Sequence, residues 1–403
     1  MKFCLEGKRI IVGVCGGIAA YKSLELIRLL RKEQVEVNVI MTKAASQFVT
    51  PFCFEVISGH HVYTDVFSEE KPGEITHIEW AKRADAAIIA PATANIIAKL
   101  ACGIADDALS TCMLAMTRNI LVCPSMNSDM YQNRIVQRNM DTLEQFGFMI
   151  IDPQVGELAC GVSGVGRLAD PETILDRLCY ALSPKDFAGK HILVTAGPTQ
   201  EAIDPVRFIS NHSSGKMGYA IAKAAEHRGA CVTLISGPTH LSSPINVTVE
   251  KIGNAQQMAD AVFQHQDHMD IIIKVAAVAD YRPEHQSLQK IKKSADEHVL
   301  LLKKNVDILL ELGKKKKQHQ ILVGFAAETN DLQLYATEKL IAKNLDMIVA
   351  NRVGIANSGF GVDTNQVTLY YQNGKHEELP LLEKDTLAHV LLDRIARMNR
   401  IHR

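Results

Sequence analysis

One pattern of apolar and polar positions recurs along almost the whole chain. A short run of apolar, mostly β-branched residues stops abruptly at Gly, Pro, Asn or Ser, and a stretch with helical periodicity follows. These runs lie within residues 9–17, 85–95, 119–127, 191–199, 231–239, 270–280, 320–329 and 346–354. Continuous apolar runs without strict alternation are typical of strands covered on both faces. The spacing leaves room for a helix between most neighbours, which predicts a parallel α/β architecture.

The length of the chain favours two domains, because 403 residues exceed one core of usual size. A helix-like segment ends within residues 181–191, Ser-Pro and a Gly follow, and a new strand begins at His191. We therefore expect domains at residues 1–187 and 188–403. Each begins with a strand and a Gly-bearing turn. Ligands of open α/β sheets bind beyond the carboxyl ends of the strands, so the residues that close each run are the first candidates for chemistry.

Composition narrows the class of protein. The chain has 44 Lys and Arg against 45 Asp and Glu, a formal charge of −1 that argues against nucleic acid as the main partner. No apolar run approaches the ~18 residues of a membrane span, and the N-terminus lacks a signal-peptide cleavage pattern. We expect a cytoplasmic protein without a membrane partner. A disulfide framework is not expected, because most of the nine cysteines lie in apolar stretches, namely Cys15, Cys102, Cys112, Cys123 and Cys231.

The first glycine turn, residues 13–18, departs from the dinucleotide fingerprint Gly-x-Gly-x-x-Gly. Cys15 stands at the second glycine position and Ile18 at the last, so the NAD motif fails. A strand-to-helix turn with Gly16 and Gly17 still offers backbone N–H groups to a phosphate, which would suit a mononucleotide such as FMN. A purely structural turn is the alternative.

A second loop, residues 210–218, contains Gly-Lys but is not a P-loop, because Ser210 and Met217 replace the required Gly and Ser/Thr. The density of donors just before a helix nevertheless favours an anion site over a simple helix cap. The donors are Asn211, Ser213, Ser214, Gly215 and Lys216.

Long segments of both halves resemble known families. Residues 13–23, 75–107, 124–131 and 157–171 resemble flavin-dependent cysteine decarboxylases. Residues 195–222, 276–283, 290–293 and 324–329 resemble phosphopantothenate–cysteine ligases. In this order on one chain, the two resemble bacterial bifunctional coenzyme A biosynthesis proteins. The resemblance implies two doubly wound domains, a flavodoxin-like flavin-binding domain followed by a Rossmann-like ligase domain.

The resemblance also implies two reactions. The ligase joins cysteine to 4′-phosphopantothenate, using CTP and Mg²⁺ and passing through an acyl-cytidylate. The decarboxylase then converts 4′-phosphopantothenoylcysteine to 4′-phosphopantetheine with FMN, which oxidises the thiol side and so provides an electron sink. Homo-oligomers are implied as well, with decarboxylase trimers and ligase dimers that could combine in a dodecamer.

The resemblance assigns the decarboxylase residues. His77 is the active-site histidine, Asn127 binds the substrate carboxylate, and Cys160, in a Gly-rich flap, is the proton donor. Without the resemblance, His77 reads as an ordinary histidine at a helix start, and Asn127 as a helix N-cap. The flavin-binding positions are Gly16, Gly17, Ser23, Thr42, Phe48, Thr93 and Asn95.

For the ligase, the resemblance makes Lys290 the lysine of a lid needed for the intermediate, and Asn211 the residue that steers the intermediate toward cysteine. Asp280 reads the nucleotide, Phe325 stacks on the base, and two lysines spaced i, i+4 point at phosphate. The CTP-binding positions are Lys274, Val275, Ala276, Asp280, Lys290, Lys304, Asn305, Val306, Asp307, Phe325, Lys339 and Lys343; the metal ligands are not assigned.

Two departures from the family pattern concern the nucleotide site. Val306 replaces the proline of Lys-Asn-Pro-Asp, and Lys274 stands where a small or apolar residue is expected. They put nucleotide selectivity in doubt more than the reaction. Two other functions compete: a non-catalytic flavoprotein regulatory subunit, which could lose His77 or Cys160, and a nicotinamide-dependent flavin reductase, which the failed dinucleotide motif disfavours.

Overall fold

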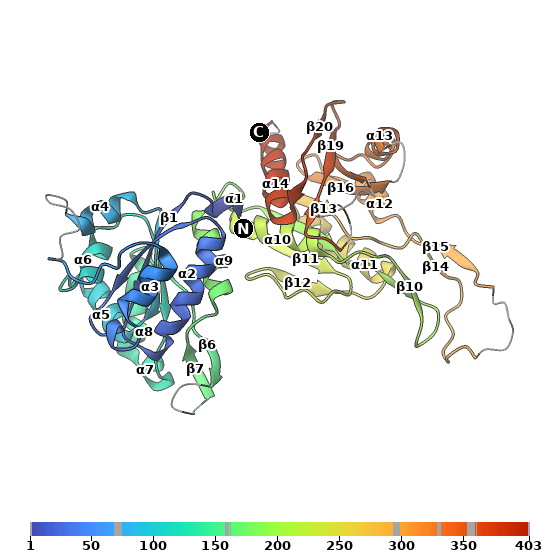
Figure 1. Cartoon of the computed structure of the whole chain (residues 1–403). Helices are drawn as coiled ribbons and strands as arrows, with labels where there is room; N and C mark the ends of the chain where they lie inside the picture. The colour runs from blue at the N-terminus through green and yellow to red at the C-terminus, as the bar shows by residue number, and fades with distance from the viewer. Residues whose placement is uncertain are drawn as a thin grey trace. The chain divides into compact units, whose positions relative to one another are not determined.

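The structure is a computed structural model that describes residues 2–67, 75–157, 161, 163–292, 299–328, 332–352, 359 and 361–401. It divides into two compact units, Met1–Ser183 and Pro184–Arg403, which are described separately (Figure 1). Within the described residues, no helix is long and apolar enough to cross a membrane.

The first unit is built on a five-stranded sheet in the order β2-β1-β3-β4-β5, with every pairing parallel. This is the flavodoxin-like order, and it confirms the predicted fold class of this half. β1, β3 and β4 are almost wholly buried, as their continuous apolar runs predict, whereas β2 and β5 lie outside the predicted runs. The strands are β1 (Arg9–Val14), β2 (Glu36–Met41), β3 (Ala86–Ala92), β4 (Asn119–Pro124) and β5 (Met149–Ile150).

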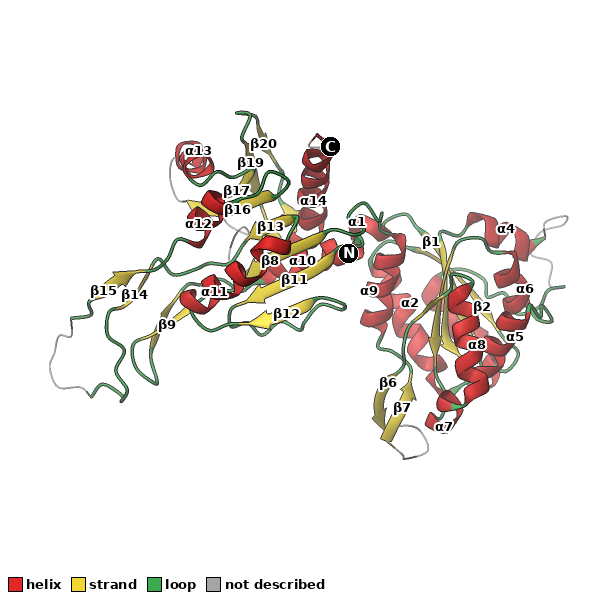
Figure 2. Cartoon of the chain, turned by 180° about the vertical axis from the view of Figure 1, so that it is seen from behind, coloured by secondary structure: helices red, strands yellow, loops and turns green. Residues whose placement is uncertain are grey.

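Helices cover both faces of this sheet (Figure 2). One face packs against α1 (Lys2–Leu5), α2 (Lys22–Lys32), α3 (Pro51–Ser58) and α9 (Pro171–Leu182). The other packs against α4 (Thr76–Arg83), α5 (Ala94–Cys102), α6 (Ala108–Ala115) and α8 (Arg134–Gln145). Short elements complete the unit: η1 (Ile18–Tyr21), η2 (Ala45–Gln47), α7 (Ser128–Gln132) and the hairpin β6 (Gln154–Glu157) and β7 (Ser163–Arg167).

The second unit has an eight-stranded sheet in the order β12-β11-β8-β13-β16-β17-β19-β20. The pairings from β12 to β17 are parallel and follow the Rossmann order, as predicted. β19 and β20 add antiparallel edge strands, which the sequence did not predict. The strands are β8 (His191–Ala196), β11 (Cys231–Ser236), β12 (Thr248–Lys251), β13 (Ile271–Lys274), β16 (Ile321–Glu328), β17 (Met347–Arg352), β19 (Val367–Tyr371) and β20 (His376–Glu378).

This sheet is also covered on both faces. α10 (Lys216–His227) and α14 (Lys384–Ile401) pack on one face. α11 (Ala255–His265), α12 (Ile308–Lys315) and α13 (Leu332–Ala342) pack on the other, and η3 (Gln266–His268) follows α11. Three two-stranded pairs flank the sheet: β9 (Gln200–Ala202) with β10 (Phe208–Ser210), β14 (Tyr281–Pro283) with β15 (Leu302–Lys304), and β18 (Thr364–Asn365) with β21 (Leu382–Glu383). The pair β14–β15 projects from the body of the unit (Figure 1).

We predict that Gly313→Ala destabilises the second unit, although alanine normally stabilises a helix interior relative to glycine by ~1 kcal/mol. A Cβ at Gly313 would lie 1.9 Å from the Lys343 carbonyl oxygen, which is backbone and cannot move away freely. We expect a loss of about 1–3 kcal/mol in the free energy of unfolding, measured by urea denaturation. Lys314→Ala, an exposed change on the same helix, is the control; equal stability of both variants would contradict the prediction.

Candidate active sites

A cavity of about 720 Å³ lies at the carboxyl edge of the first sheet, where β1, β3 and β4 end. This is the β1/β3 switch point, at which flavodoxin-like folds bind ligands. The cavity brings together turns that are far apart in the sequence. Its lining includes Gly16, Gly17, Thr93, Asn95 and Asn127, all of them predicted site residues.

The glycines of the first turn have different roles. A Cβ at Gly16 would lie 2.5 Å from the Ala44 side chain, so glycine allows the turn to pack closely against the segment after β2. At Gly17, a Cβ would meet nothing within 4 Å. The turn is therefore held in place on one side and open on the other.

The hairpin β6–β7 closes one side of the cavity. Gly166 has a φ of +141°, and a Cβ there would lie 2.1 Å from the Met126 carbonyl oxygen. The Met126 amide in turn donates to the Gly166 carbonyl at 3.0 Å. The hairpin is thus fixed against the turn that carries Asn127, and Glu157, the last residue of β6, is also one of the lining residues.

Asn127 occupies the N-cap of α7, where its side-chain oxygen accepts from the Asp129 amide at 2.8 Å. Thr93 similarly caps α5 by accepting from the Ile96 amide at 3.4 Å. Both the capping and the ligand-binding interpretations therefore apply to these residues, because each also lines the cavity. The caps fix the side chains in position before a ligand arrives.

Four predicted residues are not among those that line the cavity. Ser23 is fully buried, and its hydroxyl donates to the Ala90 carbonyl at 2.5 Å, a structural contact. Thr42 accepts from the Ala45 amide at 3.3 Å, and Phe48 is 52% exposed. His77 lies on α4 with its Nδ1 buried and without a hydrogen-bond partner among the described residues.

The predicted acid, Cys160, lies outside the described residues. The expectation that most other cysteines are buried is right for Cys15, Cys112 and Cys123 but wrong for Cys102 and Cys231, which are exposed. Cys102 is the last residue of α5 and Cys231 the first residue of β11, so an apolar local sequence did not imply burial at the end of an element. Burial raises the pKa of the Cys15 and Cys112 thiols to about 12.

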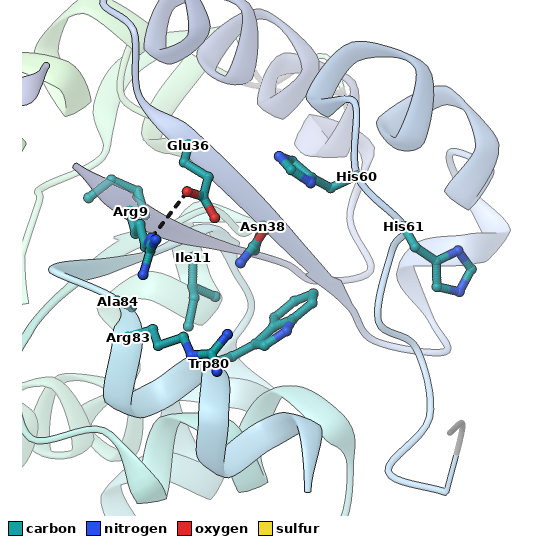
Figure 3. Close-up of a pocket in the computed structure, with 10 residues that line it drawn as sticks. Arg9, Ile11, Glu36, Asn38, His60, His61, Trp80, Arg83 and Ala84 are labelled. Atoms are coloured by element: carbon teal, nitrogen blue, oxygen red, sulfur yellow. Dashed lines mark hydrogen bonds and ion pairs between the residues drawn. The ribbon is translucent and has the colours of Figure 1, made fainter. Parts of the chain in front are cut away.

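A smaller pocket of about 220 Å³ lies at the opposite edge of the same sheet (Figure 3). Arg9 and Glu36, the first residues of β1 and β2, form an ion pair there at 3.1 Å, and His60, Trp80 and Arg83 complete the wall. This pocket is at the amino ends of the strands, where doubly wound sheets do not place their active sites.

In the second unit, the donor-rich loop leads into the N-terminus of α10 at the end of β8. A Cβ at Gly218 would lie 2.6 Å from that of Ala196, so glycine brings the helix close to the strand. Asn211 donates to the Ala277 carbonyl at 2.9 Å, which ties this loop to the segment after β13. Lys216 binds Asp363 at 2.6 Å. Ser213 accepts from the Gly215 amide at 3.4 Å, and Ser214 is half-buried.

Asn305 has a structural role among the predicted nucleotide-binding residues. It is buried, accepts from Arg282 at 2.7 Å and donates to the Ala279 carbonyl at 2.8 Å. The backbone amide of Asn305 donates to the Asp280 carbonyl at 2.8 Å. This hydrogen bond joins the two segments after β13 and β15 that were predicted to bind the nucleotide. The side chains of Asp280, Lys304 and Val306 are exposed, and Val275 and Ala276 follow β13 directly.

A charged cluster lies beside the end of β13 and consists of Lys274, Asp280, Asp307 and Lys343. Asp307 caps α12 and binds the Lys343 ammonium at 2.8 Å. Burial, followed by the charge of Lys343, lowers the pKa of Lys274 to about 8. Burial raises the pKa of Asp307, but the Lys343 ammonium and the Leu310 amide more than offset it, so the carboxyl stays ionised.

Phe325 and Lys339 are the two remaining residues predicted to bind the nucleotide, and Phe325 lies on the other face of the sheet from Lys274. Phe325 packs on the face of the sheet that α10 and α14 cover. Side chains alternate between the two faces along β13, and Ile272 lies on the face that α11, α12 and α13 cover, so Lys274 lies on that face too. Lys339 lies on α13, and the backbone of Lys343 just beyond the helix donates to its carbonyl. The i, i+4 pair thus exists, but in this structure Lys343 binds a carboxylate.

Lys290 is exposed in the segment between β14 and β15, and its neighbour Ile291 is fixed by residues that the sequence analysis missed. The Ile291 amide donates to Asp204 at 3.2 Å, and Arg207 donates to the Ile291 carbonyl at 2.9 Å. Hydrogen bonds from Arg207, before all other contacts, hold the pKa of Asp204 well below its usual range. The sequence offers no local signal that residues 204 and 291 meet.

Comparison with known proteins agrees with this geometry. Residues 2–183 match the family described as Flavoprotein, and residues 187–398 match the DNA/pantothenate metabolism flavoprotein C-terminal domain. The chain is therefore a two-domain flavoprotein of pantothenate metabolism.

Full-length relatives define the family further. The chain is 48% identical over 405 residues to the coenzyme A biosynthesis bifunctional protein CoaBC of Bacillus subtilis (strain 168), with 98% of each chain covered. It is 48% identical over 392 residues to the Haemophilus influenzae protein of the same name, covering 97% of this chain and 98% of the relative. A solved C-terminal domain of CoaBC is 48% identical and covers 53% of this chain and 97% of that one, with a TM-score of 0.46. The chain belongs to the CoaBC family and is a bifunctional enzyme of coenzyme A biosynthesis.

The cavity of the first unit fits a flavin mononucleotide. It lies at the switch point, is lined by the open Gly17, and is large enough for a planar ring system. For Mg²⁺ the fit differs: within the described residues, no group of three or more His, Cys, Asp or Glu side chains could hold a metal ion. Mg²⁺ commonly binds through phosphates and one or two carboxylates, so a nucleotide-borne ion is compatible with Asp280 or Asp307.

We predict that Lys274→Met stabilises the second unit near pH 7 and that the gain disappears at high pH. The folded-state pKa, about 8, is below the ordinary 10.5, so protonation of Lys274 disfavours the folded state. Between about pH 8 and 10.5 the unfolded chain binds more protons, so the wild type gains stability as the pH rises. At pH 7, the free energy of unfolding of Lys274→Met should exceed that of the wild type by at most about 3 kcal/mol.

Thermal unfolding at pH 7, 8.5 and 10 measures this difference. Lys316→Met, which removes a lysine that binds Asp346 at 2.9 Å, is the control and should be destabilising throughout. If the Tm of the wild type and the Tm of Lys274→Met change in parallel with pH, the prediction is wrong.

Proposed function

We propose that the second unit joins cysteine to 4′-phosphopantothenate with CTP and Mg²⁺, through an acyl-cytidylate, and that the first unit decarboxylates the product with FMN. The observation that carries the proposal is the cavity at the β1/β3 switch point, which gathers Gly16, Gly17, Thr93, Asn95 and Asn127. It supports a bound mononucleotide next to an amide that can receive a carboxylate.

FMN, when bound, accepts two electrons from the cysteine end of the substrate and returns them after CO₂ has left. The residues of this chain do the rest. Asn127, held by its cap, binds the substrate carboxylate without adding charge. His77 is the acid–base group of the site, and Cys160 donates the proton that replaces CO₂. Gly16 and Gly17 offer backbone N–H groups to the flavin phosphate or to its ring.

The ligase half depends on positioning and on cations, because negative charge concentrates on the triphosphate and on the leaving pyrophosphate. Lys290 approaches the phosphates from its anchored loop, and Lys343 can exchange its Asp307 carboxylate for a phosphate oxygen. Asn211, beside the loop after β13, orients the acyl-cytidylate for attack by cysteine.

A homo-oligomer is part of the proposal, with decarboxylase trimers and ligase dimers. The position of His77 supports it: this side chain is not among the residues that line the cavity, so a cavity completed by a second copy would bring a histidine to the flavin. Light scattering of the full chain tests this, and a monomer that retains FMN and decarboxylates would contradict it.

A non-catalytic flavoprotein is the weaker alternative. The two full-length relatives are bifunctional coenzyme A biosynthesis proteins, and the chain covers 98% of the length of each. A nicotinamide-dependent reductase has no supporting feature in the first glycine turn.

The test incubates the full chain with 4′-phosphopantothenate, cysteine, CTP and Mg²⁺ and follows pyrophosphate and CO₂ release along with the flavin spectrum. Release of both products by a yellow protein supports the proposal. Pyrophosphate alone would contradict the decarboxylase assignment, and neither product from flavin-loaded protein would favour the regulatory alternative.

We predict that two variants separate the half-reactions. His77→Asn should release pyrophosphate at the wild-type rate while CO₂ release falls by at least 100-fold, since it lacks an acid–base group. Lys290→Gln should lose pyrophosphate release to a similar extent, yet decarboxylate supplied 4′-phosphopantothenoylcysteine normally. Loss of both activities in either variant, with unchanged thermal stability, would contradict the division of labour between the units.

A further inference from the structure

A buried cation beside the flavin cavity is not explained by the residues assigned so far. Lys22, the first residue of α2, forms part of the cavity wall. Its side chain is 14% exposed, and its ammonium nitrogen is buried without a hydrogen bond to any described residue. The nearest opposite charge is Asp170, with its Oδ1 3.9 Å from the lysine Nζ.

A second cation lies close to the first. Arg167, at the end of β7, also lines the cavity and binds the same carboxylate at a long 3.5 Å. Burial, and then the charge of Arg167, lowers the pKa of Lys22. The Asp170 carboxylate therefore contacts two cations at long distances. Among the described residues that line the cavity, Glu157 is the acidic one.

Burying an ammonium without a hydrogen bond costs free energy, and proteins usually avoid this cost by pairing the ammonium with a nearby carboxylate. Other lysines of the same unit are paired in this way: the Lys99 Nζ lies 2.8 Å from a carboxylate oxygen of Asp107, and the Lys8 Nζ lies 3.2 Å from one of Asp85. An anion bound against the cavity wall would give Lys22 its missing partner. A phosphate monoester suits the pair, because its double negative charge matches two cations and its oxygens match the arginine fork.

We propose that Lys22 and Arg167 form a subsite for a phosphate monoester at the end of the first unit's cavity. The inference rests on the proposed function, in which two ligands of this cavity carry such a group, namely FMN and 4′-phosphopantothenoylcysteine. The chemistry is the same for both, so the experiment distinguishes which one uses the subsite.

The experiment uses the full chain, stripped of flavin, as wild type and as the variants Lys22→Gln, Lys22→Arg and Arg167→Gln. Flavin fluorescence gives the Kd of FMN and of riboflavin, which lacks the phosphate. Flavin-loaded protein then gives KM and kcat for CO₂ release from 4′-phosphopantothenoylcysteine and from its dephosphorylated analogue. Lys32→Gln, an exposed lysine on the same helix, is the matched control.

If FMN uses the subsite, Lys22→Gln weakens FMN binding by about 10- to 100-fold and leaves riboflavin binding unchanged. If the substrate uses it, FMN affinity is unchanged and KM for the phosphorylated substrate rises by a similar factor, with KM for the analogue unaffected. In both cases Lys22→Arg recovers much of the loss, and Arg167→Gln acts in the same direction. Arg167 is 45% exposed, so this second variant tests the subsite even if Lys22→Gln folds poorly.

The subsite would be overturned if Lys22→Gln and Arg167→Gln both left two ratios unchanged: the Kd of FMN relative to that of riboflavin, and the KM of the phosphorylated substrate relative to that of its analogue. The proposed function would remain intact. A wild type that neither binds FMN nor releases CO₂ would overturn the proposed function and this inference with it.

Discussion

Parallel pairing of buried strands is the constraint on which the rest of this molecule depends. A parallel pair needs a crossover that returns the chain to the start of the next strand, so all carboxyl ends meet at one edge. Gly16, Thr93 and Asn127 follow β1, β3 and β4, and this rule alone brings them to a single cavity. The second unit obeys it too: Asn211 lies after β8 and β9–β10, yet contacts the segment that follows β13.

Most of the architecture follows from the sequence, because a strand buried on both faces must be apolar throughout. The antiparallel edge strands β19 and β20 escaped prediction since they are short, with five and three residues, and β20 has no buried position. Backbone turns at the sheet edge were predictable in the same way. The resemblance assigned Ser23 to the flavin, but the Ala90 carbonyl satisfies its hydroxyl. Contacts such as Lys216 with Asp363 have no local signature, because the partners are far apart in the chain.

Buried positive charge is treated in two ways in this chain. Arg228 is almost fully buried, and it binds both Asp186 and Asp393, which also places it over the ring of Phe187. Such a network satisfies the guanidinium within the fold and leaves nothing for a ligand. The buried Lys22 ammonium has no hydrogen bond to a described residue, and Lys274 is half-buried beside the end of β13. Cations that are paired with carboxylates therefore stabilise the fold, whereas cations that lack such a partner are available to a ligand.

The cluster at the end of β13 shows how this availability depends on neighbours. Lys343 is neutralised by Asp307, while Lys274 is held between that ion pair and Asp280 without a hydrogen bond of its own among the described residues. A nucleotide that attracts Lys343 away from Asp307 would leave this carboxylate to Lys274, so the pair could exchange partners without exposing either charge. Lys274 stands where a small or apolar residue is expected, and Val306, in place of proline, leaves its backbone amide free to donate. Under the proposed function, both departures alter the set of hydrogen-bond donors around the nucleotide, whereas Asn211 and Lys290, to which the resemblance assigns the chemistry, match the family pattern.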